Sequence, residues 1–136
     1  MRSLFADTSA FYALLDRDDR FHGAASRAFA GFEPDDTSLV TSSYVVLETL
    51  ALLQHRIGLA PVRRFRAELQ PILDIVWVGA PIHDRALAAL IAASRRGVSL
   101  TDWTSFEIMR ERDIEEAFSF DPDFEEQGFQ LVPAAP

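Results

Sequence analysis

The stretch Leu4-Phe5-Ala6-Asp7-Thr8-Ser9-Ala10-Phe11 places an acidic side chain between a short apolar run and a helix-like pattern. Residues 3–6 are typical of a buried strand, and Thr8 or Ser9 can cap a helix whose apolar positions begin at Phe11. In α/β proteins, ligands bind in the crevice outside the carboxyl ends of parallel strands. This stretch therefore predicts a ligand-binding role for Asp7 rather than a solvated charge.

The rest of the chain repeats the alternation of strand and helix. Apolar runs predict further strands at residues 39–41, 75–78, 117–120 and 129–132, and helical periodicity predicts helices at residues 22–32, 44–56, 61–73, 83–95 and 102–112. This alternation predicts an α/β fold with a mainly parallel sheet covered on both faces. We expect a single domain over residues 1–132 and a frayed tail over residues 133–136.

The composition excludes several classes of protein. The 136 residues include no cysteine and no lysine, and all 13 basic residues are arginines. Disulfides, zinc–thiolate sites, P-loops and Schiff-base enzymes are therefore excluded. A net charge of -8 argues against a surface that binds nucleic acid throughout, although a local arginine stripe could still do so. No apolar run is long enough for a membrane span, and the first residues leave no room for the apolar region of a signal peptide. The absence of cysteine fits a reducing compartment, and we expect a cytoplasmic protein.

Glu48 is conspicuous because its helix is otherwise apolar. The segment Val45-Val46-Leu47-Glu48-Thr49-Leu50-Ala51-Leu52-Leu53 has no other charged residue. A carboxylate in such surroundings is expected to be partly buried, and a buried charge without a partner costs several kcal/mol. Glu48 therefore needs a cation, which is either an arginine or a metal ion.

Two more acids stand at the ends of predicted elements. Asp102 opens a helix in Leu100-Thr101-Asp102-Trp103, where a helix cap explains it equally well. Asp121 follows the strand-like run Phe118-Ser119-Phe120, where an Asx turn before Pro122 explains it equally well. Asp123 lies one step further along this turn and is expected to face water.

The four acids favour a metal site when they are taken as a set. Asp7, Glu48, Asp102 and Asp121 lie on or beside different buried elements, and three of them lie where the carboxyl ends of parallel strands gather. Converging carboxylates repel one another unless a cation neutralises them. Mg²⁺ prefers oxygen ligands and keeps sites for water and phosphate oxygens. The set therefore predicts metal-assisted hydrolysis of a phosphodiester.

These residues carry a resemblance to a known family. Asp7-Thr8-Ser9 after a strand, Glu48 alone in an apolar helix, Leu100-Thr101-Asp102 and Phe120-Asp121 with Phe124 and Gly128 resemble the PIN domain, in particular the VapC-type ribonuclease toxins of bacterial toxin–antitoxin pairs. The resemblance runs from about residue 4 to residue 132. It implies a three-layer α/β/α sandwich, a Mg²⁺- or Mn²⁺-dependent endoribonuclease, an antitoxin partner and often a homodimer.

The resemblance also implies roles for individual residues. Asp7, Glu48, Asp102 and Asp121 match the family's acidic quartet and would hold the metal. Ser9 would assist at the metal or phosphate, and Ser105 would support the pocket. Trp103 is a departure, because a small residue commonly follows the third acid.

Other interpretations remain open. An aspartyl-phosphate phosphatase of the haloacid-dehalogenase type would need a second acid at position 9 and a lysine, and the chain has neither. A catalytically silent PIN-like module that acts through protein contacts is the alternative from another class. The arginines at positions 56, 63, 64 and 66 could follow an RNA backbone, although a solvated helix face explains them more simply. Trp77 is expected in the core or at an interface, and the histidines in surface or capping roles, with His83 at a helix cap.

Overall fold

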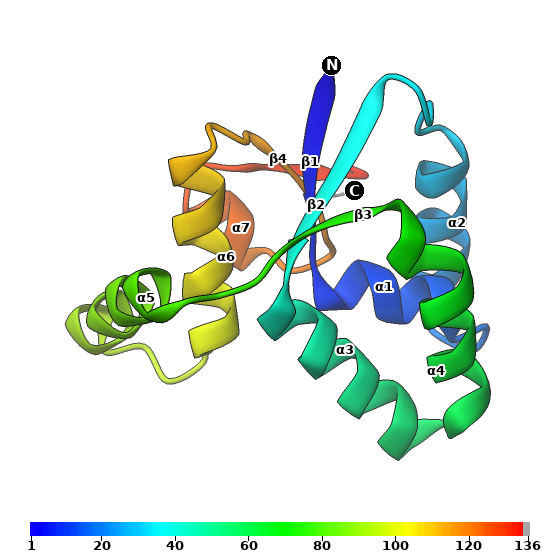
Figure 1. Cartoon of the computed structure of the whole chain (residues 1–136), viewed down its shortest axis with the longest axis horizontal. Coiled ribbons are helices and arrows are strands. Elements are labelled where there is room, and N and C mark those ends of the chain that lie inside the picture. The colour runs from blue at the N-terminus through cyan, green and yellow to red at the C-terminus, as the bar shows by residue number, and fades with distance from the viewer. Residues whose placement is uncertain (135–136) are drawn as a thin grey trace.

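Five parallel strands form one sheet in the order β3-β2-β1-β4-β5 (Figure 1). In this computed structural model, which describes residues 1–134, the strands are β1 (Arg2–Ala6), β2 (Thr37–Ser42), β3 (Leu73–Val76), β4 (Glu116–Phe118) and β5 (Gln130–Val132). Residues 135 and 136 of the expected tail lie outside the described residues. The predicted parallel sheet is confirmed.

Helices cover both faces of the sheet. They are α1 (Thr8–Leu15), α2 (His22–Ala30), α3 (Ser43–Arg56), α4 (Leu59–Arg64), α5 (Ala80–Ala93), α6 (Leu100–Glu111) and α7 (Asp123–Glu126), with a π-helical segment η1 (Phe65–Leu69) and a 3-10 segment η2 (Gln70–Ile72) after α4. Figure 1 shows α1 to α4 on one side of the strands and α5 to α7 on the other. The expected three-layer α/β/α sandwich is therefore confirmed.

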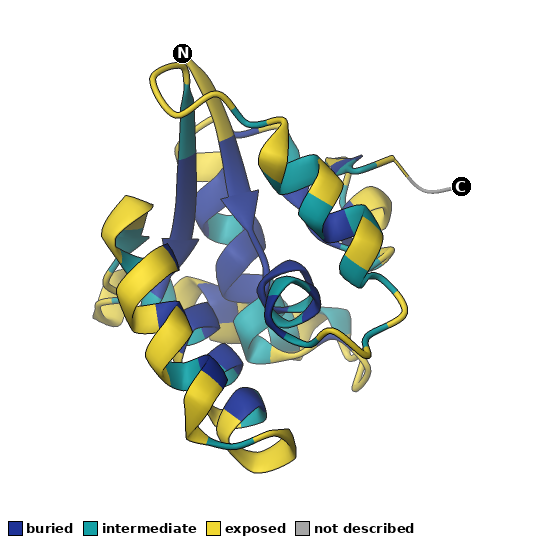
Figure 2. Ribbon diagram, turned by 90° about the vertical axis from the view of Figure 1, so that its right-hand side faces the viewer, coloured by how far each residue is buried: buried dark blue, intermediate teal, exposed yellow. Residues whose placement is uncertain are grey.

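The core is centred on the opening stretch of the chain. Leu4, Phe5 and Ala6 of β1 are fully buried, because β1 pairs with β2 on one side and with β4 on the other. Figure 2 shows the carboxyl-terminal halves of β1 and β2 and the inner sides of the helices buried, whereas the start of β1, the outer helix faces and the loops are exposed. Among residues 1–134, no helix combines the length and the apolar character that a membrane crossing requires.

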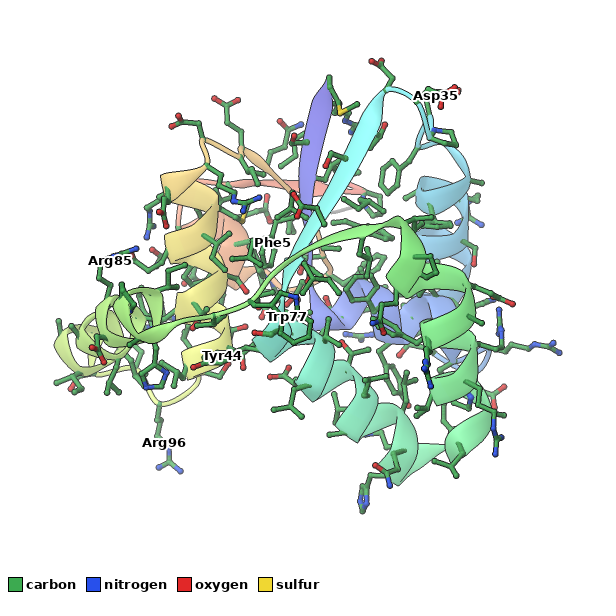
Figure 3. The ribbon with its side chains drawn as sticks, in the orientation of Figure 1. Phe5, Asp35, Tyr44, Trp77, Arg85 and Arg96 are labelled. Carbon is green, nitrogen blue, oxygen red and sulfur yellow. The ribbon has the colours of Figure 1, made fainter. Side chains whose placement is uncertain are left out.

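The predicted boundaries of β3 were wrong. The strand runs from Leu73 to Val76, because β2 ends at Ser42 and Ser42 is paired with Val76, so the residues after Val76 have no partner strand. The N–H of Val78 donates instead to Ser43 Oγ at 2.9 Å. Trp77 is consequently 73% exposed in the link between β3 and α5 (Figure 3), so of its two expected places, the core was wrong and an interface stays a prediction.

Two helix predictions also need correction. The helix expected over residues 61–73 changes from α-helix to π- and 3-10-helix, and Pro71, which lacks an N–H for the α-helical hydrogen bond, lies in the last segment. The helix expected to open at His83 already begins at Ala80, with Pro81 in its first turn and Gly79 as its N-cap. His83 is therefore not a cap, and its Nδ1 is hydrogen-bonded to the Tyr44 hydroxyl.

Candidate metal centre

The four predicted acids line one cavity at the carboxyl end of the sheet. Asp7 lies directly after β1, Glu48 on α3, Asp102 in the first turn of α6, and Asp121 in the link between β4 and α7. All four belong to the lining of a cavity of about 550 Å³. The structure thus brings together side chains that are up to 114 residues apart in the sequence.

Asp7 is the most buried of these acids and is held by two serine hydroxyls. Its Oδ2 accepts hydrogen bonds from Ser9 Oγ and from Ser119 Oγ, each at 3.0 Å. Ser9 Oγ in turn accepts from the N–H of Phe120 at 2.9 Å, and Ser119 Oγ accepts from the N–H of Asp121 at 3.0 Å. The two hydroxyls therefore bind the Asp7 carboxylate and the Asp121 segment into one network.

Ser119 is a site residue that the sequence interpretation missed. It was assigned to a strand over residues 117–120, but β4 ends at Phe118, and the N–H groups of Phe120 and Asp121 donate to serine hydroxyls instead of to a neighbouring strand. Ser119 is fully buried. A polar residue within the apolar run Phe118-Ser119-Phe120 was the signal that could have identified it.

Burial and mutual repulsion raise the pKa values of two carboxyls. The pKa of Asp7 is raised to about 7, first by burial and then by the negative charge of Asp102, while hydrogen bonds from the two serines oppose the shift. The pKa of Asp102 is raised to about 6, again mainly by burial, with the Ser99 backbone hydrogen bond opposing and the charge of Asp121 adding to the shift. The raised pKa values show that no cation of residues 1–134 compensates the negative charges of Asp7 and Asp102.

The four predicted acids have no salt bridge to an arginine of the described residues. Within residues 1–134, neither Asp7, Glu48, Asp102 nor Asp121 takes part in an ion pair. Glu48 is half-buried, as its apolar surroundings predicted, and the arginine ion pair that could have explained it is not formed. Buried carboxylates without a counter-charge favour the entry of a cation.

The structural explanations for Asp102 and Asp121 hold, and they leave carboxylate oxygens available. Asp102 completes a capping box, in which its Oδ2 accepts from the N–H of Ser99 at 3.0 Å. Asp121 forms an Asx turn, in which its Oδ1 accepts from the N–H of Asp123 at 2.9 Å. Within the described residues, Oδ1 of Asp102 and Oδ2 of Asp121 accept no hydrogen bond from the protein. Each acid is therefore held in place by one oxygen and offers the other.

Asp123 does not face water as expected. One carboxylate oxygen from each of Asp102, Asp121 and Asp123 lies within 4.8 Å of the other two. Asp123 is the first residue of α7, and the Asx turn keeps it beside Asp121. Its side chain is only 20% exposed and pairs with Arg95 at 3.7 Å, and burial and the charge of Asp121 raise its pKa. Three carboxylate oxygens at this spacing fit a hard divalent cation such as Mg²⁺ or Mn²⁺.

Ser105 and Trp103 lie away from the acids. Ser105 is fully buried, and its Oγ donates to the carbonyl of Thr101 at 3.0 Å, one turn back along α6. Trp103 is 7% exposed and packs edge-on against Phe106. Neither side chain lines the cavity. The tryptophan that departs from the family pattern thus fills the core and does not narrow the cleft.

Comparisons with known proteins agree with this architecture. The PIN domain family matches residues 4–130. The 23S rRNA-specific endonuclease VapC20 of Mycobacterium tuberculosis is 35% identical over 130 residues, which is 95% of this chain and 97% of the relative. The crystal structure of Mycobacterium tuberculosis VapC20, described as a Sarcin-Ricin loop cleaving toxin, covers 93% of this chain and 95% of its own with a TM-score of 0.83.

A more distant structure confirms the fold alone. FitAcB from Neisseria gonorrhoeae is 12% identical, with a TM-score of 0.68 over 94% of this chain and 95% of its own. The two comparisons with VapC20 are stronger, because sequence identity and coverage are both high. The chain belongs to the PIN-domain family of nucleases, as a VapC-type member.

Proposed function

We propose that this protein is an endoribonuclease toxin that depends on Mg²⁺ or Mn²⁺. Asp7, Glu48, Asp102 and Asp121 would hold the metal, with Asp123 beside them. The observation that carries the proposal is the convergence of Asp7, Glu48, Asp102 and Asp121 on one cavity, where none of the four forms an ion pair with an arginine of residues 1–134. When bound, the metal would lower the pKa of a water and neutralise charge on the phosphodiester during hydrolysis.

The chain's own residues would orient the reacting groups. Ser9 and Ser119 hold the Asp7 carboxylate in a fixed orientation. Loss of hydrogen bonds that orient a metal ligand typically lowers metal affinity about 10- to 100-fold. The capping box fixes Asp102 on the rigid start of α6. Ser105 would act only through the position of α6, since its hydroxyl is bonded to the helix backbone.

We further propose a ribosomal RNA loop as the substrate and a small antitoxin as the protein partner. The support is the similarity to VapC20, whose name gives 23S rRNA and whose structure is described as cleaving the Sarcin-Ricin loop. Such a substrate places the activity in the cytoplasm. An antitoxin would be recognised as the product of an adjacent gene that copurifies with this chain and stops cleavage, and lack of inhibition by that product would contradict the assignment.

The test is RNA cleavage by protein that has been purified free of any partner. We expect cleavage of a hairpin carrying the Sarcin-Ricin sequence in Mg²⁺ and none in EDTA, because the proposed reaction needs a metal ion to lower the pKa of the water and to neutralise the phosphodiester. Glu48→Gln should lose about 10²- to 10³-fold in rate, as when one charge-stabilising group is removed from an active site. Intact RNA in every reaction, together with a calorimetric titration that detects no Mn²⁺ binding, would favour a catalytically silent interaction module.

We also propose that the chain forms a homodimer. Large apolar side chains remain exposed on α3, on α5 and in the link before α5: Leu47 is 69% exposed, Trp77 73% and Ile91 69%. Exposed apolar side chains of this size are typical of protein interfaces when they form a patch. We expect dimers in sedimentation experiments and weaker association of Trp77→Ser. Monomers at all protein concentrations would rule the dimer out.

A further inference from the structure

The cavity that holds the acids also contains two arginines. Arg20 precedes α2, and Arg56 is the last residue of α3; both line the same cavity as the carboxylates. Arg56 lies eight residues after Glu48, which corresponds to about 12 Å along the helix axis. The cavity therefore combines acidic and basic side chains, and Arg56 lies more than two helical turns from Glu48.

Arg20 is held in position by a stack of aromatic rings. The guanidinium of Arg20 lies over the ring of Phe21, with Cζ 4.5 Å from the ring centroid. Phe21 itself stacks on Phe120, with centroids 4.5 Å apart and planes 7° from parallel. Phe120 directly precedes Asp121, so the stack ties Arg20 to the segment that carries the metal-binding acid. The neighbouring Asp19 carboxylate accepts the N–H of Phe21 at 2.9 Å, which fixes the turn that carries Arg20.

Arg56 is oriented in a comparable way. Its Cζ lies 5.3 Å from the centroid of the Tyr12 ring, and Tyr12 lines the cavity from α1. A guanidinium that lies over an aromatic ring is pre-oriented and loses less entropy when it binds an anionic group through two hydrogen bonds. Both cavity arginines thus have an aromatic support within the fold.

Neither arginine forms an ion pair within residues 1–134, although other arginines do. Arg2, Arg85 and Arg112 are each paired with acidic side chains outside the cavity. Among the hydrogen bonds of the described residues, Arg20 and Arg56 donate none, and a guanidinium can bind two oxygens of a phosphate at once. We propose that Arg20 and Arg56 form a clamp for RNA phosphates that flank the scissile one. This assignment rests on the proposed function, because it takes the acids as the point of cleavage.

The clamp can be tested by RNA binding without metal, which separates it from catalysis. Fluorescence anisotropy in EDTA with a labelled Sarcin-Ricin RNA hairpin should show about tenfold weaker binding for Arg20→Ala and for Arg56→Ala. The slope of log Kd against log salt should fall by about 0.7 to 0.9 for each variant. Each variant neutralises one phosphate fewer, so RNA binding releases fewer counterions. Arg56→Lys should restore the slope, since it keeps the charge, and part of the affinity.

Two exposed arginines outside the cavity serve as matched controls. Arg17→Ala, three residues before Arg20, and Arg63→Ala, seven residues after Arg56, remove the same charge but should leave the slope unchanged. In Mg²⁺, the two cavity variants should raise KM about tenfold with kcat within about twofold of wild type. Equal slopes for all four alanine variants, or no RNA binding by wild type, would overturn the clamp. Binding with the expected slopes but no cleavage would instead refute the proposed function and leave the clamp supported.

Discussion

Asp7→Asn is expected to lower RNA cleavage by about 10³-fold and, at the same time, to stabilise the metal-free protein above pH 7. The loss of cleavage follows from the proposed metal-binding role of this buried carboxylate, which two serines hold in place. The gain in stability follows from the same burial. An asparagine keeps the shape and the acceptor oxygen for both hydroxyls but removes a charge that has no counter-ion.

The sign of the stability change follows from the raised pKa of Asp7, which is about 7 in the folded protein. The folded state holds the proton more tightly than the unfolded state, so this contribution to stability is complete below about pH 4 and is lost as the pH rises through 7. Asp7→Asn removes that loss, which corresponds to at most about 4 kcal/mol at pH 8.

The measurements are cleavage rates in Mg²⁺ and urea unfolding in EDTA at pH 5 and pH 8. Asp35→Asn is the matched control, because Asp35 is exposed in the loop before β2 (Figure 3), at the end of the strand opposite to the carboxyl end where the acids lie. Asp35→Asn should change neither the cleavage rate nor the free energy of unfolding. Cleavage by Asp7→Asn at the rate of wild type would contradict the metal assignment. A variant less stable than wild type at pH 8 would show that the Asp7 charge is compensated in a way the structure does not contain.

The positions of the acids were predictable because local patterns determine them. The apolar run before Asp7 forms β1, and residues 4–6 of that run are fully buried, so the acid is at the carboxyl end of a central strand. Glu48 could be identified because an apolar helix surrounds it, and it is half-buried without an ion pair. In both cases the argument needed only the period of the local element and the cost of burying a charge.

Features that depend on pairing between distant segments were not predictable from local patterns. The end of β3 is set by where β2 stops, and this leaves Trp77 exposed although it lies in a continuous apolar run. Ser119 reaches Asp7 only because β4 pairs with β1, across 112 residues of sequence. Asp123 was misplaced because an Asx turn keeps it beside the acids. Single-sequence periodicity contains none of this information.

The roles of Arg20 and Arg56 also depend on contacts between distant segments, so local sequence patterns could not predict them. Arg56 belonged to a group of four arginines for which a solvated helix face was the simpler explanation, and this explanation fits Arg64, which pairs with Glu68 four residues further on. Arg56 differs from Arg64 because it lines the cavity over Tyr12. Arg20 had no distinguishing pattern in the sequence, since its place depends on the stacking of Phe21 against Phe120.

Metal affinity is expected to fall steeply as the pH is lowered, more than for a site built from exposed carboxylates. The pKa of Asp7 is raised to about 7 and that of Asp102 to about 6, so both side chains hold protons at pH 5. A metal ion must displace these protons. The apparent Kd for Mn²⁺ should therefore rise about tenfold between pH 7 and pH 6, where one proton is displaced, and up to about 100-fold between pH 6 and pH 5, where two are displaced.

Calorimetric titration with Mn²⁺ across this pH range checks the expected affinities, and Tm with and without metal checks the linkage to folding. In the metal-free protein, the raised pKa values of Asp7 and Asp102 cost stability as the pH rises through 6 and 7, and bound metal removes that cost. The increase in Tm on adding Mn²⁺ should therefore be large near pH 7.5 and absent near pH 5. In the metal-free protein, Asp7→Asn should abolish the loss of Tm near pH 7 and keep the loss of Tm near pH 6. A Kd that is constant from pH 5 to pH 7 would mean that the metal binds elsewhere, because carboxyls as buried and mutually repelling as these cannot bind a cation without releasing protons.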